Sequence, residues 1–309
     1  MPRAKGILWP AEGQQVYDVG REESVPAPVS LVVRHLWNVR WRRPADQPFA
    51  SSVVSNPIAH LTFEDAVGGR LHGHEVPAPL VHGLVSRVFS VELPVAGRVT
   101  GVAFHPGGLT ALLGVGMREL ADTVVPATRV FGDGVGEVAR AVLAEPDEGA
   151  RREIVLSYLG ELLGPQQDRV AGDQAYSVVR AAEDLMRQRD QVSLPGVAEQ
   201  VSVSPRTLQR MFSQYVGASP LWVLRRYRLQ DAASLIDAGE GENLADLAAS
   251  LGFADQAHFT RAFTAVIGVP PSGYRAGVRP GEDGTRRADA TVETASRSAT
   301  AAPAPPSQS

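Results

Sequence analysis

Two stretches of the sequence place arginine side chains in the same order of residue types. Each begins with a helix-capping residue, Ser204 in the first copy and Asp255 in the second, and each carries an arginine, Arg210 or Arg261, two residues before a phenylalanine. The caps, the arginines and the phenylalanines of the two copies are each 51 residues apart. Because the arginine fork is suited to base edges and phosphates, the repeat favours contact with nucleic acid over catalysis.

Each copy predicts two helices joined by a tight turn, at Ser202 or Gly252, the second helix having one apolar and one polar face. Ser204 before Pro205 is a favoured helix start, and a glycine, Gly217 or Gly268, ends each second helix. This is the pattern of a helix-turn-helix. The apolar faces are Leu208, Met211, Phe212 and Tyr215, then Phe259, Phe263, Val266 and Ile267; the polar faces are Arg206, Gln209, Arg210 and Ser213, then Ala257, Thr260, Arg261 and Thr264.

A long helix is predicted between the two copies, capped by Ser219 and opened by Pro220. At about 1.5 Å per residue it would span roughly 25–30 Å. It could therefore hold two DNA-contacting helices near one turn of DNA apart, about 34 Å. It carries Arg225 and Arg226, and because these two are adjacent we expect at most one of them to face a phosphate. Arg228, beside an apolar leucine, is interpreted as a structural ion-pair residue.

The amino-terminal half contains a different candidate, His72-x-His74 followed by Glu75, which resembles the start of a metal-ligand set on a cupin-like β-barrel. Glycine and proline flank this stretch, which favours loop histidines, so we expect no metal and no cofactor. The sequence contains no Gly-x-Ser-x-Gly, P-loop or His-Glu-x-x-His motif. We therefore expect that the protein is not an enzyme. A cupin-like metal-dependent enzyme with a helical appendage remains the alternative. Further histidines that could complete such a set are His60, His82 and His105.

The elements that must position these residues change along the chain. Residues 31–41 alternate as in a half-buried strand, with Val33, His35, Trp37, Val39 and Trp41 on one side and Arg34, Asn38 and Arg40 on the other. Trp37 and Trp41 would line either a core or an aromatic ligand pocket. Further strands are predicted at Ile58–Phe63, Leu84–Val91 and Arg98–Phe104, and helices at Leu109–Leu113, Met117–Leu120, Val135–Leu143 and Arg152–Leu163.

The predicted fold class is therefore an α+β multidomain chain. Residues 1–165 form a sensing or dimerisation domain, β-rich and cupin-like to about 108 and helical from about 109. Residues 166–172 form a linker, 173–276 an all-α domain with two helix-turn-helix units, and 277–309 a disordered tail. The tail has no aromatic residue and no Leu, Ile or Met, so it cannot offset the entropy of ordering.

Composition excludes several classes of protein. The 309 residues include no cysteine, which rules out disulfides, thiolate metal sites and cysteine nucleophiles. No apolar run of about 18 residues predicts a membrane span, and the first residues lack the apolar segment of a signal peptide, so a cytoplasmic location is expected. The net charge is −4, yet residues 173–279 hold 11 Arg and 11 acidic residues. The overall acidity therefore does not exclude a DNA-binding region.

The carboxyl-terminal region resembles the AraC/XylS family of transcription regulators over about residues 173–276. Pro270 departs from the serine that is common there, which removes a cap from the last short helix. A relative of the alkyl-transfer repair type would need an acceptor thiol, and the chain has none. The resemblance rests on residues 204–212, Gly217-x-Ser219-Pro220, Arg228-Leu229-x-x-Ala232, Leu247-Ala248, Leu251-Gly252-Phe253, residues 255–263, Gly268-Val269-Pro270-Pro271 and Tyr274-Arg275.

The resemblance implies that each second helix enters a major-groove segment of double-stranded DNA. His258 is also open to a capping or packing role near its turn. The first copy is expected to discriminate sequence more strongly, because Ala257 and Thr260 stand where it has Arg206 and Gln209. Carried over residue by residue, the base-reading positions are Arg206, Gln209, Arg210, Gln256, His258 and Arg261, and the phosphate-contacting positions are Ser204, Thr207 and Arg225.

Residues 30–125 look more loosely like the sensory half of actinobacterial-type members of this family. The pieces that match are Ser55-Asn56-Pro57, residues 60–63, residues 102–108 and residues 117–122. This implies a β-rich effector or dimerisation domain without naming a ligand. We therefore expect a sequence-specific transcription factor modulated by a small molecule. RNA polymerase contact and a homodimer are left open, and membrane association is not expected.

Overall fold

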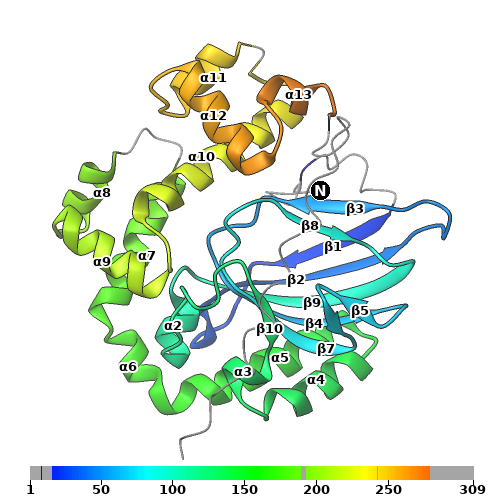
Figure 1. Cartoon of the computed structure of the whole chain (residues 1–309). Helices are drawn as coiled ribbons and strands as arrows, with labels where there is room; N and C mark the ends of the chain where they lie inside the picture. Colours follow the sequence, from blue (N-terminus) through cyan, green and yellow to red (C-terminus); the bar gives the residue numbers. More distant parts are fainter. Residues whose placement is uncertain (1–7, 9–15, 189–192, 242, 279–309) are drawn as a thin grey trace, which may run out of the picture.

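The computed structural model describes residues 8, 16–188, 193–241 and 243–278. Its amino-terminal part is built on a six-stranded antiparallel sheet in the order β1-β2-β9-β4-β7-β10 (Figure 1). A β-rich region followed by a helical one confirms the predicted fold class. The strands are β1 (Tyr17–Glu22), β2 (Val33–Arg42), β4 (His60–Ala66), β7 (Ala78–His82), β9 (Ala96–Phe104) and β10 (Val124–Pro126), with β3 (Ala50–Val53) paired to β8 (Phe89–Glu92) and β5 (Arg70–Leu71) to β6 (His74–Glu75).

Several predicted elements differ from the observed ones. The strand predicted at Leu84–Val91 is a strand only from Phe89, because residues 83–88 form a loop that other parts of the chain contact. The helix predicted at Met117–Leu120 is a series of turns. The predicted linker at 166–172 is helical and buries Val170. Of the predicted tail, residues 279–309 lie outside the described part of the chain, and Val278 still packs on the last helices.

Strand β2 confirms the predicted alternation over most of its length. His35, Trp37, Val39 and Trp41 all line one cavity on the same face of the sheet. A bulge between Val33 and His35 shifts the register, so Val33 packs into the apolar core instead. The two indoles lie over cross-strand glycines, since a Cβ on Gly97 or Gly101 would fall 2.2 or 2.1 Å from an indole carbon.

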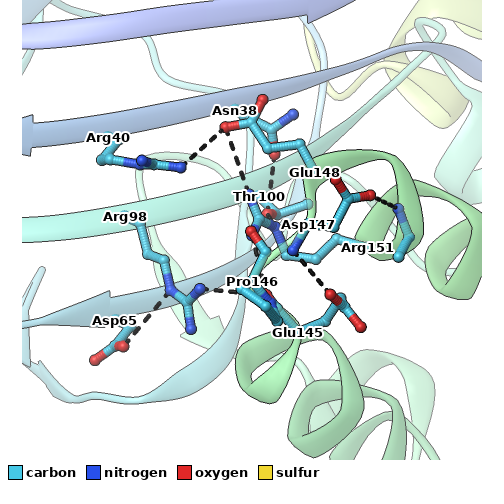
Figure 2. Close-up of polar contacts among 11 residues, drawn as sticks. Asn38, Arg40, Asp65, Arg98, Thr100, Glu145, Pro146, Asp147, Glu148 and Arg151 are labelled. Atoms are coloured by element: carbon cyan, nitrogen blue, oxygen red, sulfur yellow. Dashed lines mark hydrogen bonds and ion pairs between the residues drawn. The ribbon is translucent and has the colours of Figure 1, made fainter.

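The opposite face of the sheet is covered by helices α4 (Val135–Ala144) and α5 (Glu148–Leu163) (Figure 1). Arg151, which is only 4% exposed, fixes their junction. It donates hydrogen bonds to Thr100 Oγ1 at 3.0 Å and to the carbonyl oxygens of Glu145 at 3.0 Å and Pro146 at 2.9 Å. Arg98 on β9 donates to the carbonyl oxygen of Glu145 from the sheet side (Figure 2). These contacts attach the α4–α5 junction to strand β9 on the face of the sheet opposite the cavity.

The remaining helices continue along the chain into the predicted all-helical region. None of the helices in the described residues is long and apolar enough to span a membrane. The short helices of the first part are η1 (Val29–Leu31), α2 (Gly108–Leu113), α3 (Thr128–Phe131), η2 (Gly164–Gln166) and α6 (Gln167–Ala171). They are followed by α7 (Gln174–Arg187), α8 (Leu194–Gln200), α9 (Pro205–Tyr215), α10 (Pro220–Asp237), α11 (Leu244–Ser250), α12 (Gln256–Ile267) and α13 (Pro271–Arg275).

The apolar core does not end where the helical region begins. One cluster of buried side chains joins the sheet and α4–α5 to helices α7, α8, α9 and the first half of α10. At this junction Tyr176 stacks on Tyr215 with ring centroids 6.2 Å apart, and its hydroxyl donates to the carbonyl oxygen of Leu31 at 2.8 Å. A second cluster holds the other half of α10 with α11, α12 and α13. The first helical unit therefore shares the core of the sheet domain, and the second unit packs in a separate cluster that also contains Val54 of the sheet domain.

Candidate DNA-binding surface and ligand cavity

The first repeated unit consists of α8, a turn and α9. The turn is sharp at Ser202, whose φ is +56°, and the Ser204 hydroxyl accepts a hydrogen bond from the Thr207 amide at 3.1 Å. This cap confirms the predicted helix start. It also engages Ser204 and Thr207 with each other, since their hydroxyl oxygens lie 2.8 Å apart. Of the predicted base-reading residues, Arg206, Gln209 and Arg210 are all exposed on α9.

The second unit, α11 and α12, repeats this construction with different details. The Asp255 carboxylate accepts from the His258 amide at 2.6 Å, and the turn passes through Gly252 at φ +70°. Arg228 on α10 donates to the carbonyl oxygen of Gly252 at 3.1 Å, a backbone contact, and its predicted ion pair stays a prediction. The His258 ring is half-buried and packs edge-on against Phe253 at 5.5 Å. The exposed predicted residues on α12 are Gln256 and Arg261.

Helix α10 lies between the two units (Figure 1), and its two adjacent arginines differ in burial. Arg225 is exposed, as a phosphate-contacting residue must be, whereas Arg226 is 1% exposed. The Arg226 guanidinium donates to the carbonyl oxygens of Ser55, Ser86 and Arg87 at 3.0, 3.2 and 2.8 Å. Burial lowers the pKa of Arg226 to about 10, so it stays charged at neutral pH. Arg226 therefore contacts the sheet domain and not DNA.

A cavity of about 250 Å³ lies between the six-stranded sheet and the β3–β8 pair. Its walls are mostly aromatic and aliphatic, and Trp37 and Trp41 do line it. The resemblance to known regulators did not locate this cavity, but the alternating pattern of β2 pointed to the two tryptophans. Other apolar lining residues are Tyr17, Phe89, Val91 and Val99.

One part of the cavity wall is polar. Glu64 on β4 is 1% exposed, with Oε1 2.7 Å from His82 Nε2 and Oε2 3.3 Å from His72 Nε2. The Thr62 hydroxyl donates to Glu64 Oε1 at 2.7 Å. Burial alone would raise the pKa of Glu64, but the contacts with the two histidines outweigh it and hold the pKa of this carboxyl below its ordinary value.

The sequence pattern groups His72 with His74, but in the structure these two histidines have different partners. His72 faces Glu64, whereas His74 places Nε2 2.9 Å from the carbonyl oxygen of Val124. His60 lines the cavity beside Trp37, whose indole N–H donates to its Nδ1 at 3.2 Å, and burial lowers the pKa of His60 to about 3. The residue that sequence reasoning missed is Glu64. The sequence feature that could have located Glu64 is its place in a strand, because residues 60, 62 and 64 alternate and therefore share one face, the one that lines the cavity.

Two capped, arginine-bearing helices, each second in a helix-turn-helix and linked by one long helix, define the double helix-turn-helix class of DNA-binding domain. Residues 197–277 match a family model described as a helix-turn-helix domain. This match agrees with the resemblance of the carboxyl-terminal part of the chain to AraC/XylS regulators. Residues 24–126 match a second model, described as a domain of unknown function.

The chain is similar to several transcription regulators in sequence and to several solved structures. Over 88 residues the chain is 38% identical to the HTH-type transcriptional activator RhaS of Escherichia coli O139:H28, an alignment that covers 28% of this chain and 31% of that protein. The chain thus spans about a third of the length of the curated relatives it matches. An AraC-type regulator structure from Chromobacterium violaceum is 27% identical and covers 37% of this chain and 99% of that one, with a TM-score of 0.31. A structure of ToxT from Vibrio cholerae is 10% identical over 85% of this chain and 99% of that one, with a TM-score of 0.39.

Proposed function

We propose that the chain is a sequence-specific transcription regulator that binds double-stranded DNA through α9 and α12 and responds to a small molecule in the cavity. The observation that carries the proposal is the paired exposure of arginine and glutamine on two capped helices of one α10-linked unit. Arginine matches guanine O6 and N7, and glutamine matches adenine N6 and N7. We expect regulation in the cytoplasm, through a change in DNA affinity or in contact with RNA polymerase.

The individual roles follow from exposure and position on each helix. On α9 the base-reading residues are Arg206, Gln209 and Arg210, and on α12 they are Gln256, His258 and Arg261. The partial burial of His258 against Phe253 makes its contact the smallest of these. Phosphate contacts belong to the capped start of α9, with Ser204 and Thr207, and to Arg225 at the exposed side of α10.

A physical connection between cavity and DNA-binding helices supports the response to a ligand. The carbonyl oxygens that accept from Arg226 belong to the loops at residues 55 and 86–87. Gln230, one turn further along α10, donates to the carbonyl oxygen of Val54 at 2.6 Å. Ser55, Val54 and the neighbouring Val85 line the cavity. A ligand that moves these loops must therefore move α10 or break its hydrogen bonds.

A second connection runs through buried Glu183 on α7. Its carboxylate accepts from the Tyr227 hydroxyl on α10 and lies 3.3 Å from Arg34 Nη1 on β2. Arg34 is adjacent to His35, which lines the cavity. Both cavity walls, β2 and the loops, thus reach α10 by side-chain contacts. Two discrete arrangements of these contacts would couple ligand binding to the spacing of α9 and α12.

Selection of bound DNA from a random library tests the proposal. The full chain is expected to enrich one sequence motif, and a variant carrying Arg206→Ala, Arg210→Ala and Arg261→Ala is expected to enrich none. Arg140→Ala, which removes an exposed arginine on α4, is the matched control and should return the motif of the unaltered chain. Enrichment of no motif by the unaltered chain, or of the same motif by the triple variant, contradicts the proposal.

A further inference from the structure

We propose that Glu64, His72 and His82 form a binding site for one divalent transition-metal ion of the zinc class. These residues come from three separate places in the fold: strand β4, the β5–β6 turn and the end of strand β7. One carboxylate oxygen and one nitrogen from each histidine lie within 4.8 Å of one another. The inference goes beyond the proposed function, since it concerns neither the DNA contacts nor the identity of the small molecule.

The spacing of the donor atoms fits a single coordination sphere. At a zinc–ligand distance of about 2.0–2.2 Å, neighbouring ligand atoms of a tetrahedral site lie about 3.3–3.6 Å apart. The 3.3 Å between His72 Nε2 and Glu64 Oε2 already matches this separation. The 2.7 Å between His82 Nε2 and Glu64 Oε1 is a hydrogen-bond distance, and a metal ion would replace that proton and separate the two atoms slightly.

The buried carboxylate supplies an independent observation. Glu64 is 1% exposed, and its Oε2 accepts no hydrogen bond from any described residue; its polar neighbour is the His72 ring nitrogen 3.3 Å away. Its Oε1, in contrast, is contacted by both Thr62 and His82. A buried carboxylate oxygen without a hydrogen-bond donor is costly unless a cation compensates it. Thr62 holds the carboxylate in place from the side, in the way that hydrogen bonds to metal-binding carboxylates orient them.

The position of His72 also requires an explanation. His72 and Gly73 are the two turn residues between β5 and β6, with φ of +51° and +80°. A two-residue hairpin turn of this kind is normally found at the surface. The His72 side chain is nevertheless only 11% exposed, because the hairpin lies over the sheet and brings the ring to Glu64. Phe89 packs against both histidine rings, with centroids 5.1 and 5.6 Å away, and shields them from solvent.

Two histidines and one glutamate supply three protein ligands and leave a fourth position for another donor. All three residues line the cavity, so this fourth position would be reached from within it. The site would thus hold the metal in contact with whatever the cavity contains. Bound metal would also join the β5–β6 hairpin to β4 and β7, which predicts a higher melting temperature on metal addition.

Metal binding by the full chain, freed of any affinity tag and of metal by chelation, tests the inference. Zn²⁺ alone is the probe, with bound metal measured by equilibrium dialysis and mass spectrometry and melting followed by calorimetry. The unaltered chain should bind one equivalent of Zn²⁺. Glu64→Gln, His72→Ala and His82→Ala should each weaken binding at least about tenfold. His74→Ala is the matched control, because His74 lies two residues after His72 in the sequence but contacts the carbonyl oxygen of Val124. This variant should bind Zn²⁺ as the unaltered chain does.

Circular dichroism and binding of the selected DNA show whether each variant is folded. A site variant that keeps the helix content of the unaltered chain but loses Zn²⁺ supports the site. Binding well below one equivalent by the unaltered chain overturns the inference. Equal Zn²⁺ affinity in His72→Ala, or loss of Zn²⁺ in His74→Ala, overturns it as well. Because metal content is measured without DNA, failure here is distinguishable from failure of the proposed DNA-binding function.

Discussion

Arg210 is exposed on α9, and the buried Phe212 two residues later fixes which side of the helix it occupies. Arg210→Ala is expected to weaken binding to the selected DNA by about 1–3 kcal/mol and to relax one base position, because a bidentate contact with guanine is lost. Fluorescence anisotropy with the selected site and its single-base variants measures this. An unchanged base preference at every position would show that Arg210 does not contact bases.

Arg225 belongs to the same surface but is expected to act on the DNA backbone. Arg225→Ala should weaken binding to all sequences about equally and reduce the slope of log affinity against log salt by about 1, since one fewer phosphate is neutralised. Anisotropy titrations at several salt concentrations measure that slope. The control is Arg140→Ala, distant on α4. A salt slope equal to that of the unaltered chain would remove Arg225 from the interface.

At the residue scale the sequence predicts what depends on helical period and capping. Ser204, Asp255 and Ser219 all cap their helices as expected, because a short oxygen-bearing side chain before a helix has few other stable arrangements. It does not predict that Arg226 is buried while Arg225 is exposed. That difference depends on the loops near residues 55 and 86, which are distant in sequence and supply the carbonyl acceptors.

Among the elements, α10 has the central role, since Arg226 and Gln230 join it to the cavity loops. Arg226→Met is expected to lower the free energy of unfolding by about 2–4 kcal/mol, because three backbone carbonyl oxygens lose the hydrogen bonds that the buried guanidinium donates. Thermal and urea denaturation measure the loss.

Arg225→Met is the matched control, because it replaces the adjacent exposed arginine and should leave the melting temperature nearly unchanged. Equal melting temperatures for Arg226→Met and Arg225→Met would show that the Arg226 contacts do not stabilise the structure. Arg226→Met should also reduce any effect of a cavity ligand on DNA affinity.

The predictability of the elements follows from how much periodicity each one shows. Helices α4, α5, α9 and α12 were predicted because their apolar residues recur every three or four positions over several turns. Strands β1 and β3 are not predicted, since both are short and their cavity-facing sides include the polar residues Arg21 and Ser51. Their positions are determined by pairing with β2 and β8, which a local pattern cannot show.

Over the whole molecule, the domain division remains a prediction. The sequence places a linker at 166–172, but the largest apolar cluster continues across this segment through Val170 into α7 and α9. Composition cannot reveal this continuity, because the side chains concerned, such as Tyr176 and Tyr215, look like the core of either domain. The consequence is that α9 shares the main core of the sheet domain, while α12 packs in a smaller cluster with α10, α11, α13 and Val54.

Two histidines of the sheet domain, His35 and His105, predict a loss of stability in acid. Burial lowers the pKa of His35 to about 2 and that of His105 to about 3, with nearby arginines adding to both shifts. In the unfolded chain each histidine has its ordinary pKa of about 6.5 and takes up a proton below that pH, whereas in the folded chain it does not. Folding is therefore disfavoured progressively as the pH falls from about 6.5 towards 3. Each histidine contributes up to about 1.4 kcal/mol per pH unit in that range.

His105→Gln, which cannot take up the proton, should reduce the drop in melting temperature between pH 7.5 and pH 5. Calorimetry at the two pH values measures the drop. A matched control is His258→Gln, which replaces a half-buried histidine of the second unit. A drop in His105→Gln as large as in the unaltered chain would show that His105 is not kept neutral by folding.

The most direct test of DNA binding by two linked helices is a hydroxyl-radical footprint of the full chain on its selected site. The account predicts protection of two adjacent major-groove segments on one face of the duplex, about one helical turn apart. Arg210→Ala should weaken one segment and Arg261→Ala the other. Repetition of the paired footprint would indicate a homodimer. Protection of a single segment, or loss of both segments equally in each variant, would contradict the assignment of α9 and α12 as separate DNA-contacting helices.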